Sequence, residues 1–293
     1  MKLSGSITAL VTPFKGRSID EDALRRLVRC QLKSGTAGLV PCGSTGEAAT
    51  LHPNEYRRVV EVVAGEADGR VPVIAGVGSN DTEKAVVLAK SARDAGADAL
   101  LVLVPYYNKP TQEGMFRHFG AVARAVPLPT VAYNIPGRTG VNMAPATLAR
   151  IVAAYPNVFA VKEASGSLDQ VSETLALCPK GFTVLSGDDS LTVPMMSIGA
   201  KGVISVLSNV LPKESAMMVA AALRGDFKSA AAWHLRLLPA MKALFVETNP
   251  IPVKAAAQML GFGSAEPRLP LTPATAATRA ALKAAWKKAG LRL

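Results

Sequence analysis

Residues Val158–Gly166 read Val-Phe-Ala-Val-Lys-Glu-Ala-Ser-Gly. The run before Lys162 is β-branched, aromatic or small, and it predicts a buried strand that ends on a lysine. An ammonium is costly to desolvate, so burial lowers its pKa, and a neutral amine can attack a carbonyl carbon to form a Schiff base. Most lysine side chains reach solvent, so this stretch alone does not show that Lys162 is a buried nucleophile. The rest of the sequence has to distinguish the two alternatives.

Short apolar runs alternate with stretches of helical periodicity through most of the chain. Eight such strand-then-helix units occur in about 225 residues. This alternation is typical of a parallel sheet, and eight units predict an α/β fold, a (β/α)₈ TIM barrel. We expect the strands at Ile7–Val11, Gly38–Pro41, Val71–Ala75, Ala99–Val104, Thr130–Asn134, Val158–Lys162, Thr183–Leu185 and Gly202–Val206.

The competing fold is a doubly wound sheet with a nucleotide site. Its fingerprint, G-x-G-x-x-G after the first strand, is missing from the sequence. The nearest match, Gly76-Val77-Gly78, follows the third expected strand and lacks the third glycine. The barrel is therefore favoured.

Helix boundaries follow from capping residues. The capping box Ser18-x-x-Glu21 predicts the start of the first helix and Gly35 its end, and Asn80 or Asp81 caps a later one. Further helices are expected at 54–67, 81–95, 111–125, 144–154, 167–177, 191–198 and 212–224.

The chain divides into two predicted regions. Residues 1–225 form the barrel that carries the active site. Residues 226–293 are rich in Ala and Leu and show no strand signal, so they predict a C-terminal helical appendage, with helices at Asp226–Val246, Pro250–Leu260 and Pro273–Ala289.

Composition narrows the function classes. Three widely spaced cysteines, three histidines and no C-x-x-C indicate neither a disulfide framework nor a metal site, and we expect no cofactor.

No apolar run approaches ~18 residues and no signal peptide is apparent, so we expect a cytoplasmic protein without a membrane span. The net charge of +11 lacks the aromatic interleaving of a nucleic-acid surface and is interpreted as a solvated basic face that also attracts anionic substrates.

The active site of such a barrel lies at the carboxyl ends of its strands. Lys162 ends the sixth expected strand, whereas Lys201 precedes the eighth and Lys109 lies in a loop, so geometry singles out one lysine. Other polar residues converge on the same face: Ser44 and Thr45 after the second strand, Tyr107 after the fourth, Tyr133 on the fifth and Gly187 after the seventh.

A Schiff base also needs proton transfer. Tyr133, Tyr107 and Ser44 supply hydroxyl groups for a relay, although each tyrosine could instead be a buried aromatic with one satisfied hydrogen bond. The loop Gly43–Glu47 is interpreted either as an anion cradle or as a plain turn that caps the next helix.

Four motifs resemble the dihydrodipicolinate synthase (4-hydroxy-tetrahydrodipicolinate synthase) family. They are Gly43–Glu47, Tyr133–Pro136 with Arg138–Gly140, Val161–Gly166 and Ser186–Asp189, and the resemblance extends to Asn249–Lys254. It implies a lyase with class I aldolase chemistry that joins pyruvate to L-aspartate 4-semialdehyde in diaminopimelate and lysine biosynthesis. It also implies a homotetramer built as a dimer of dimers.

The resemblance assigns roles residue by residue. Lys162 forms the imine with pyruvate, Tyr133 relays protons, and Tyr107 completes the relay from a neighbouring subunit. Ser44 stands where the family's relay residue is usually a threonine, so the hydroxyl is retained. The remaining roles are in substrate binding: Thr45 holds the pyruvate carboxylate, Arg138 holds the carboxylate of the semialdehyde, and Gly187 and Ile204 line the pyruvate pocket.

Two other functions remain open at this point. Gly-Ser-Thr-Gly also occurs in N-acetylneuraminate lyases, so a different pyruvate-dependent aldolase, acting on N-acetylneuraminate or a 2-keto-3-deoxy sugar acid, is the alternative. Arg138 favours a compact carboxylate over a polyol. A non-catalytic ligand-binding protein is the third reading, and the joint presence of Lys162, Tyr133, Tyr107 and Arg138 speaks against it.

Some members of the resembled family are inhibited by L-lysine at the dimer interface. In that pattern the chain keeps Asn80 and Tyr106. It carries Ala48, Pro53, Tyr56 and Lys84 in place of a serine, two histidines and a glutamate, and His52 lies one residue from the expected place. Lys84 would repel a cationic ligand, so the sequence predicts insensitivity to L-lysine.

Overall fold

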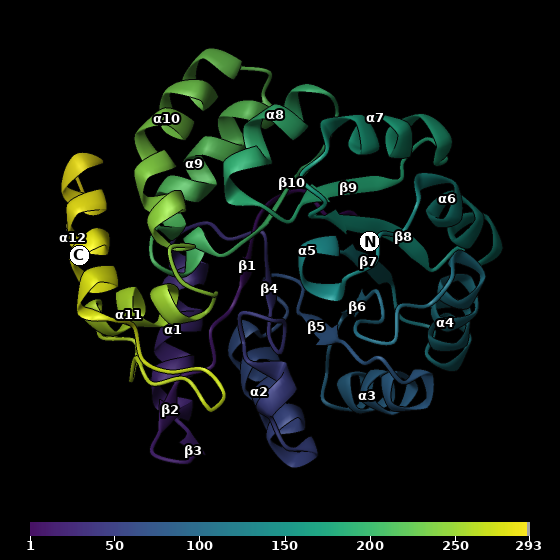
Figure 1. The fold of residues 1–293 in the computed structure, drawn as a ribbon, viewed down its shortest axis with the longest axis horizontal. Helices are drawn as coiled ribbons and strands as arrows, with labels where there is room; N and C mark the ends of the chain where they lie inside the picture. The colour runs from purple at the N-terminus through teal and green to yellow at the C-terminus, as the bar shows by residue number, and fades with distance from the viewer. Residues whose placement is uncertain (292–293) are drawn as a thin grey trace.

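The computed structural model describes residues 1–291. Eight strands in that part of the chain form one parallel sheet in the order β4-β1-β10-β9-β8-β7-β6-β5, surrounded by helices (Figure 1). Their bounds are β1 Gly5–Ala9, β4 Gly38–Val40, β5 Ile74–Val77, β6 Ala99–Leu103, β7 Thr130–Asn134, β8 Val158–Glu163, β9 Thr183–Ser186 and β10 Gly202–Ser205. The predicted TIM barrel is confirmed.

The barrel closes between β4 and β5. A parallel bridge joins Leu39 to Val73, and the Leu39 N–H donates to the Pro72 carbonyl at 3.0 Å. The backbones approach so closely here that a Cβ on Gly76 would lie 2.1 Å from the Cys42 carbonyl oxygen. Only glycine fits this position, because any side chain would push the seam apart.

Helices follow the strands around the outside of the barrel. They are α1 Glu21–Lys33, α2 Pro53–Ala67, α3 Thr82–Asp94, α4 Gln112–Ala125, α6 Pro145–Ala154, α7 Leu168–Leu177, α8 Thr192–Ser197 and α9 Pro212–Leu223. A short helix that the sequence analysis missed, α5 Pro136–Thr139, follows β7 directly. It matters because it carries Arg138.

Several boundaries differ from the prediction, and two of the differences have a clear physical reason. Ser18 does not cap α1: it pairs with Lys15 in a small hairpin, β2 Phe14–Lys15 with β3 Ser18–Ile19. The cap is Asp20, whose carboxylate accepts the Ala23 N–H at 2.9 Å. Strand β5 begins at Ile74 rather than Val71, because Pro72 has no N–H to donate to the ladder. Of the two predicted caps of α3, Asn80 and Asp81, the structure has Asp81.

The core has two parts. One fills the barrel interior with side chains from most of the strands, among them Ile7, Val40, Leu101, Val131 and Ile204. The other lies between the strands and the outer helices. Tyr133 belongs to the interior cluster, so its ring is buried among the side chains that fill the barrel.

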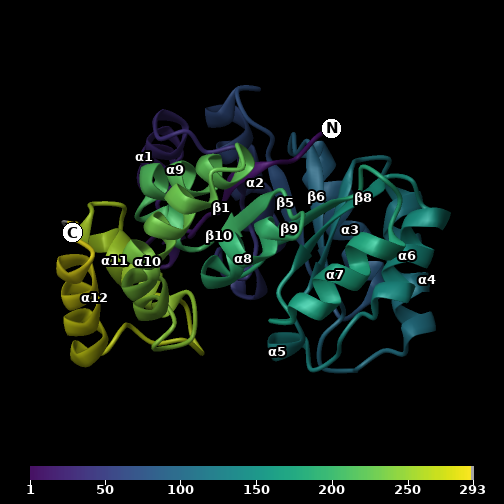
Figure 2. The ribbon, with the colours of Figure 1, turned by 90° about the horizontal axis from the view of Figure 1, so that it is seen from above.

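Three further helices lie beside the barrel at the C-terminal end of the described chain (Figure 2). They are α10 Phe227–Ala243, α11 Ile251–Met259 and α12 Ala276–Lys288, and α10 packs against both α9 and α12. All three were predicted, although residues 292 and 293 of the predicted appendage lie outside the described residues. Within residues 1–291 no helix combines the length and apolar character that crossing a membrane requires.

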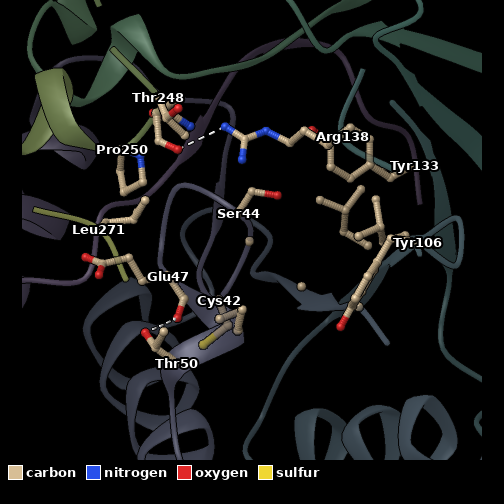
Figure 3. Close-up of a pocket in the computed structure, with 18 of the residues that line it drawn as sticks. Cys42, Ser44, Glu47, Thr50, Tyr106, Tyr133, Arg138, Thr248, Pro250 and Leu271 are labelled. Atoms are coloured by element: carbon tan, nitrogen blue, oxygen red, sulfur yellow. Dashed lines mark hydrogen bonds between the residues drawn. The ribbon is translucent and has the colours of Figure 1, made fainter. Parts of the chain in front are cut away.

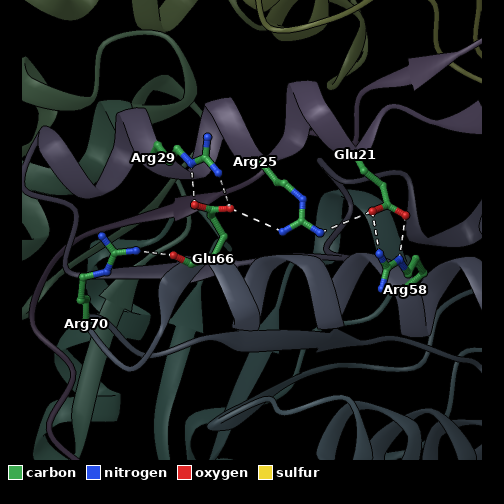
Figure 4. Close-up of polar contacts among 6 residues, drawn as sticks. All are labelled: Glu21, Arg25, Arg29, Arg58, Glu66 and Arg70. Carbon is green, nitrogen blue, oxygen red and sulfur yellow. Dashed lines mark hydrogen bonds and ion pairs between the residues drawn. The ribbon is translucent and has the colours of Figure 1, made fainter.

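Part of the basic charge is paired on the surface. Arg29 of α1 contacts Glu66 of α2 at 2.6 Å, and Arg58 of α2 contacts Glu21 of α1 at 2.7 Å, with Arg25 between them (Figure 4). Each exposed pair contributes little stability. The contacts show that this stretch of α1 is not a free basic face.

Candidate active site

Lys162 is buried near the carboxyl end of β8. Its register partners are Tyr133 of β7 and Leu185 of β9, and only 5% of its surface is exposed. Burial lowers the pKa of its ammonium to about 8; the Asp189 carboxylate opposes this shift and the charge of Arg138 adds to it. The sequence prediction of a desolvated lysine agrees with this placement.

Tyr133 lies directly beside that amine. The Lys162 Nζ is 4.3 Å from the centre of the Tyr133 ring. Burial raises the pKa of the phenol to about 12, while nearby Arg138 and Ser44 act in the opposite direction. The phenol therefore stays protonated at neutral pH and can donate a proton.

Ser44, Tyr133 and Arg138 line one cavity of about 300 Å³. Figure 3 shows their side chains around a common space, with Tyr106 on the same side as Tyr133. Other lining residues come from the C-terminal region, including Thr248, Asn249, Pro250, Arg268 and Leu271. The site is thus built by both the barrel and the segments after it.

The other predicted binding residues are not on the wall of this cavity, and neither is Lys162. Thr45 and Ile204 are buried, and Gly187 is half-buried. A Cβ on Gly187 would lie 3.2 Å from the Lys162 Cε and 2.6 Å from the Ala164 Cβ. Glycine at this position therefore keeps the space around the amine open.

Tyr107 is not brought to this site within one chain. Its side chain is 86% exposed and its φ is +72°. Tyr106, its neighbour, lines the cavity instead. A role for Tyr107 therefore requires a second copy of the chain.

The Gly43–Glu47 loop is held by charges that the sequence analysis missed. The Glu47 carboxylate pairs with Lys254 of α11 at 2.5 Å and accepts the Arg268 N–H at 2.8 Å. Both side chains of the pair are almost fully buried, and Lys254 also donates to the Thr12 carbonyl. Burial lowers the pKa of Lys254, and the carboxylate of Glu47 opposes that shift. In the sequence, the only sign of this pair is that Lys254 stands within the apolar run Ile251–Ala257.

Asp189, the last residue of the motif Ser186–Asp189, is a second buried acidic residue. Its carboxylate accepts hydrogen bonds from the Ser205 hydroxyl at 2.5 Å and from the Val206 and Leu207 N–H groups at 3.0 and 2.9 Å. Burial raises its pKa. Asp189 thereby fixes the end of β10, immediately after Ile204.

No group of three or more His, Cys, Asp or Glu side chains within residues 1–291 is arranged to hold a metal ion. The three cysteines are free, and Cys42 and Cys178 are buried. Burial raises the pKa of both thiols, above its usual range for Cys42 and to about 11 for Cys178.

The fold and this site define the class: a TIM-barrel protein whose site centres on a buried lysine at the carboxyl ends of its strands. A model of the dihydrodipicolinate synthetase family matches residues 2–289. The chain therefore belongs to the dihydrodipicolinate synthetase family, as the four sequence motifs indicated.

Individual members of the family are similar to this chain over nearly its full length. A protein from Pelobacter propionicus named 4-hydroxy-tetrahydrodipicolinate synthase is 53% identical over 287 residues, 98% of this chain and 99% of that one. The solved dihydrodipicolinate synthase from Aquifex aeolicus is 46% identical, with a TM-score of 0.97 and 99% of each chain covered. That from Acinetobacter baumannii, complexed with pyruvate, is 40% identical with a TM-score of 0.96, over 99% of this chain and 100% of that one.

Proposed function

We propose that this chain is a 4-hydroxy-tetrahydrodipicolinate synthase, a lyase that condenses pyruvate with L-aspartate 4-semialdehyde in diaminopimelate and lysine biosynthesis. The observation that carries the proposal is Lys162, buried against Tyr133 with its pKa lowered to about 8. The named Pelobacter propionicus relative, 53% identical, supports this reaction over other pyruvate-dependent aldolases.

The proposed first step forms an imine. The neutral Lys162 amine adds to the keto carbon of pyruvate, and the carbinolamine loses water to give the protonated imine. Tyr133 supplies the proton that lets the hydroxyl leave, because its phenol is held in the protonated form. Ser44, on the same cavity, passes protons onward, and Tyr107 of a neighbouring subunit completes the relay.

The second step makes the carbon–carbon bond. Loss of a proton from the pyruvate methyl group gives an enamine, which attacks the aldehyde carbon of the semialdehyde. The semialdehyde's own amine then displaces Lys162 from the imine carbon, which closes the ring and regenerates the enzyme.

Binding is assigned to the groups around the amine. Thr45 holds the pyruvate carboxylate, and Gly187 and Ile204 border the pyruvate. Arg138 lines the cavity and has a guanidinium suited to the carboxylate of the semialdehyde. The relative from Acinetobacter baumannii was solved with pyruvate, which supports a pyruvate site in this chain.

We also propose a cytoplasmic homotetramer, arranged as a dimer of dimers. The exposed Tyr107 supports this assembly, because only a neighbouring subunit can bring it to a site. The free cysteines suit a reducing compartment. Sedimentation of the wild type and of Tyr107→Phe tests whether the assembly exists independently of that hydroxyl.

A substrate panel tests the reaction. Pyruvate is supplied with L-aspartate 4-semialdehyde, N-acetylmannosamine or a sugar aldehyde, and the products are identified by mass. The proposal requires product from the semialdehyde at a rate far above the others. A preference for N-acetylmannosamine or the sugar aldehyde would assign the chain to the alternative aldolase reactions.

A further inference from the structure

Asn249 is a buried residue of the segment between α10 and α11. It is 5% exposed, yet it lines the cavity that also contains Ser44, Tyr133 and Arg138. Its side-chain amide Nδ2 donates to the Thr45 hydroxyl at 3.0 Å. Its backbone carbonyl accepts a hydrogen bond from the Arg138 Nη2 at 2.9 Å, which is the dashed line that ends on the Arg138 guanidinium in Figure 3.

One residue thus contacts the groups assigned to both substrate carboxylates. We propose that Asn249 is a positioning residue that turns the Thr45 hydroxyl toward the carboxylate of pyruvate; this inference rests on the function proposed above. It touches neither reacting carbon, and it acts through Thr45.

The direction of the hydrogen bond between Asn249 and Thr45 determines where the Thr45 hydroxyl hydrogen can point. A threonine hydroxyl has one hydrogen to donate and lone pairs that accept. Because Asn249 donates to Thr45 Oγ1, the Thr45 hydrogen is left free to donate to a carboxylate. An acceptor at position 249 would take up that hydrogen and turn it away from the substrate.

The oxygen of the Asn249 side-chain amide is buried and has no hydrogen-bond partner among the described residues. Two other buried asparagines use both ends of their amides: Asn134 donates to Asn142 and accepts from Met143 N–H, and Asn209 donates to Ala9 O and accepts from Val11 N–H. An unsatisfied buried acceptor costs stability, so packing alone does not explain an asparagine at position 249.

Both ends of the Thr45–Asn249 contact are anchored. Glu47 lies two residues after Thr45 and pairs with Lys254, five residues after Asn249. This buried pair ties the loop after β4 to α11 and fixes the distance that the amide must span. The geometry therefore presents Nδ2 to Thr45 with little freedom to move.

The test uses pyruvate alone. Wild-type protein, Asn249→Ala, Asn249→Asp, Thr45→Val and the double variant Thr45→Val/Asn249→Ala are reduced with borohydride over a range of pyruvate concentrations. The adduct is quantified by intact mass, and the half-saturating pyruvate concentration is compared. Gln258→Ala is the matched control, because it removes an exposed amide from α11 whose oxygen accepts a hydrogen bond from Arg279, away from Thr45.

Asn249→Ala is expected to raise half-saturation about tenfold, equivalent to about 1.4 kcal/mol. Asn249→Asp, which has the same size, should raise it further, because it accepts the Thr45 hydrogen and repels the anion. The double variant should match Thr45→Val, because Asn249 acts through Thr45. The control should match the wild type.

The outcomes separate the two proposals. If the wild type forms no adduct, the proposed function fails. If the wild type forms an adduct and Asn249→Ala and Asn249→Asp share its half-saturation, the positioning role is overturned while the function stands. Additive effects in the double variant would also overturn it. If Asn249→Ala does not fold, Asn249→Asp carries the comparison.

Discussion

Lys162 and Tyr133 face each other as register partners on β8 and β7, with the amine 4.3 Å from the ring centre. The same burial acts on the two groups in opposite ways. It lowers the pKa of the amine to about 8 and raises that of the phenol to about 12. Between these values the pair combines a neutral nucleophile with a proton donor, which is what imine formation needs.

This pair predicts a pH profile. Below the lysine pKa of about 8 the amine is protonated and unreactive, so kcat/KM for pyruvate should rise about tenfold per pH unit and level off near pH 8. Initial rates at low pyruvate between pH 6 and 10, with saturating aldehyde, measure it. A rise that continues to pH 10 would show that Lys162 keeps an ordinary pKa.

Arg138 should act on the aldehyde substrate. Arg138→Ala removes a charged hydrogen-bonding partner, which costs about 1.5–3 kcal/mol, so KM for L-aspartate 4-semialdehyde should rise about 10- to 100-fold while that for pyruvate changes little. Arg138→Lys is the control: it keeps the charge without the planar fork and should recover part of the loss. Equal changes in both KM values would reopen the sugar-acid aldolase alternative.

The buried ion pair between Glu47 and Lys254 should contribute strongly to the stability with which α11 packs on the barrel. Lys254→Met leaves the Glu47 carboxylate buried without its cation, at a cost of about 3–5 kcal/mol, and Glu47→Gln in the same chain should restore part of it. Thermal unfolding measures both. Arg117→Met, which breaks the exposed pair with Glu113, serves as control and should cost less than about 1 kcal/mol. A Tm for Lys254→Met equal to the wild type would contradict this.

L-lysine should leave the rate nearly unchanged at millimolar concentration. Tyr56, at a position where the sensitive pattern has histidine, is buried and donates its hydroxyl to the Gly76 carbonyl at 2.9 Å, so it is not available to a ligand. Lys84 is exposed and would repel the ligand's ammonium groups. Initial rate against lysine concentration at sub-saturating pyruvate is the measurement. Clear inhibition below millimolar lysine would mean that other residues build the site.

Local sequence patterns were sufficient to predict the barrel and the buried position of Lys162 near the end of its strand. Strand β7 was predicted at its observed bounds, because the run Thr130–Asn134 is compact and mostly apolar and is soon followed by Pro136, which begins α5. The capping box predicted Ser18 as the cap of α1 because it is a local pattern, but Ser18 pairs with Lys15 in the hairpin and Asp20 caps the helix instead. Errors of this kind are confined to a few residues at element ends.

Polar contacts between residues far apart in the sequence could not be predicted from the sequence. Lys254 pairs with Glu47 across 207 residues, and Asn249 contacts Thr45 across 204. No periodicity or spacing in the sequence relates such positions; only the folded barrel brings them together. The same holds for Asp189, whose partners Val206 and Leu207 become visible only when β9 and β10 lie side by side.

The central claim is that Lys162 is the nucleophile. Incubation with pyruvate and borohydride, followed by peptide mapping, tests it most directly, with Lys162→Ala as control. The account predicts one reduced pyruvate adduct, located on Lys162 and absent from the variant. An adduct on another lysine, or a wild-type protein that forms none, would contradict the imine mechanism.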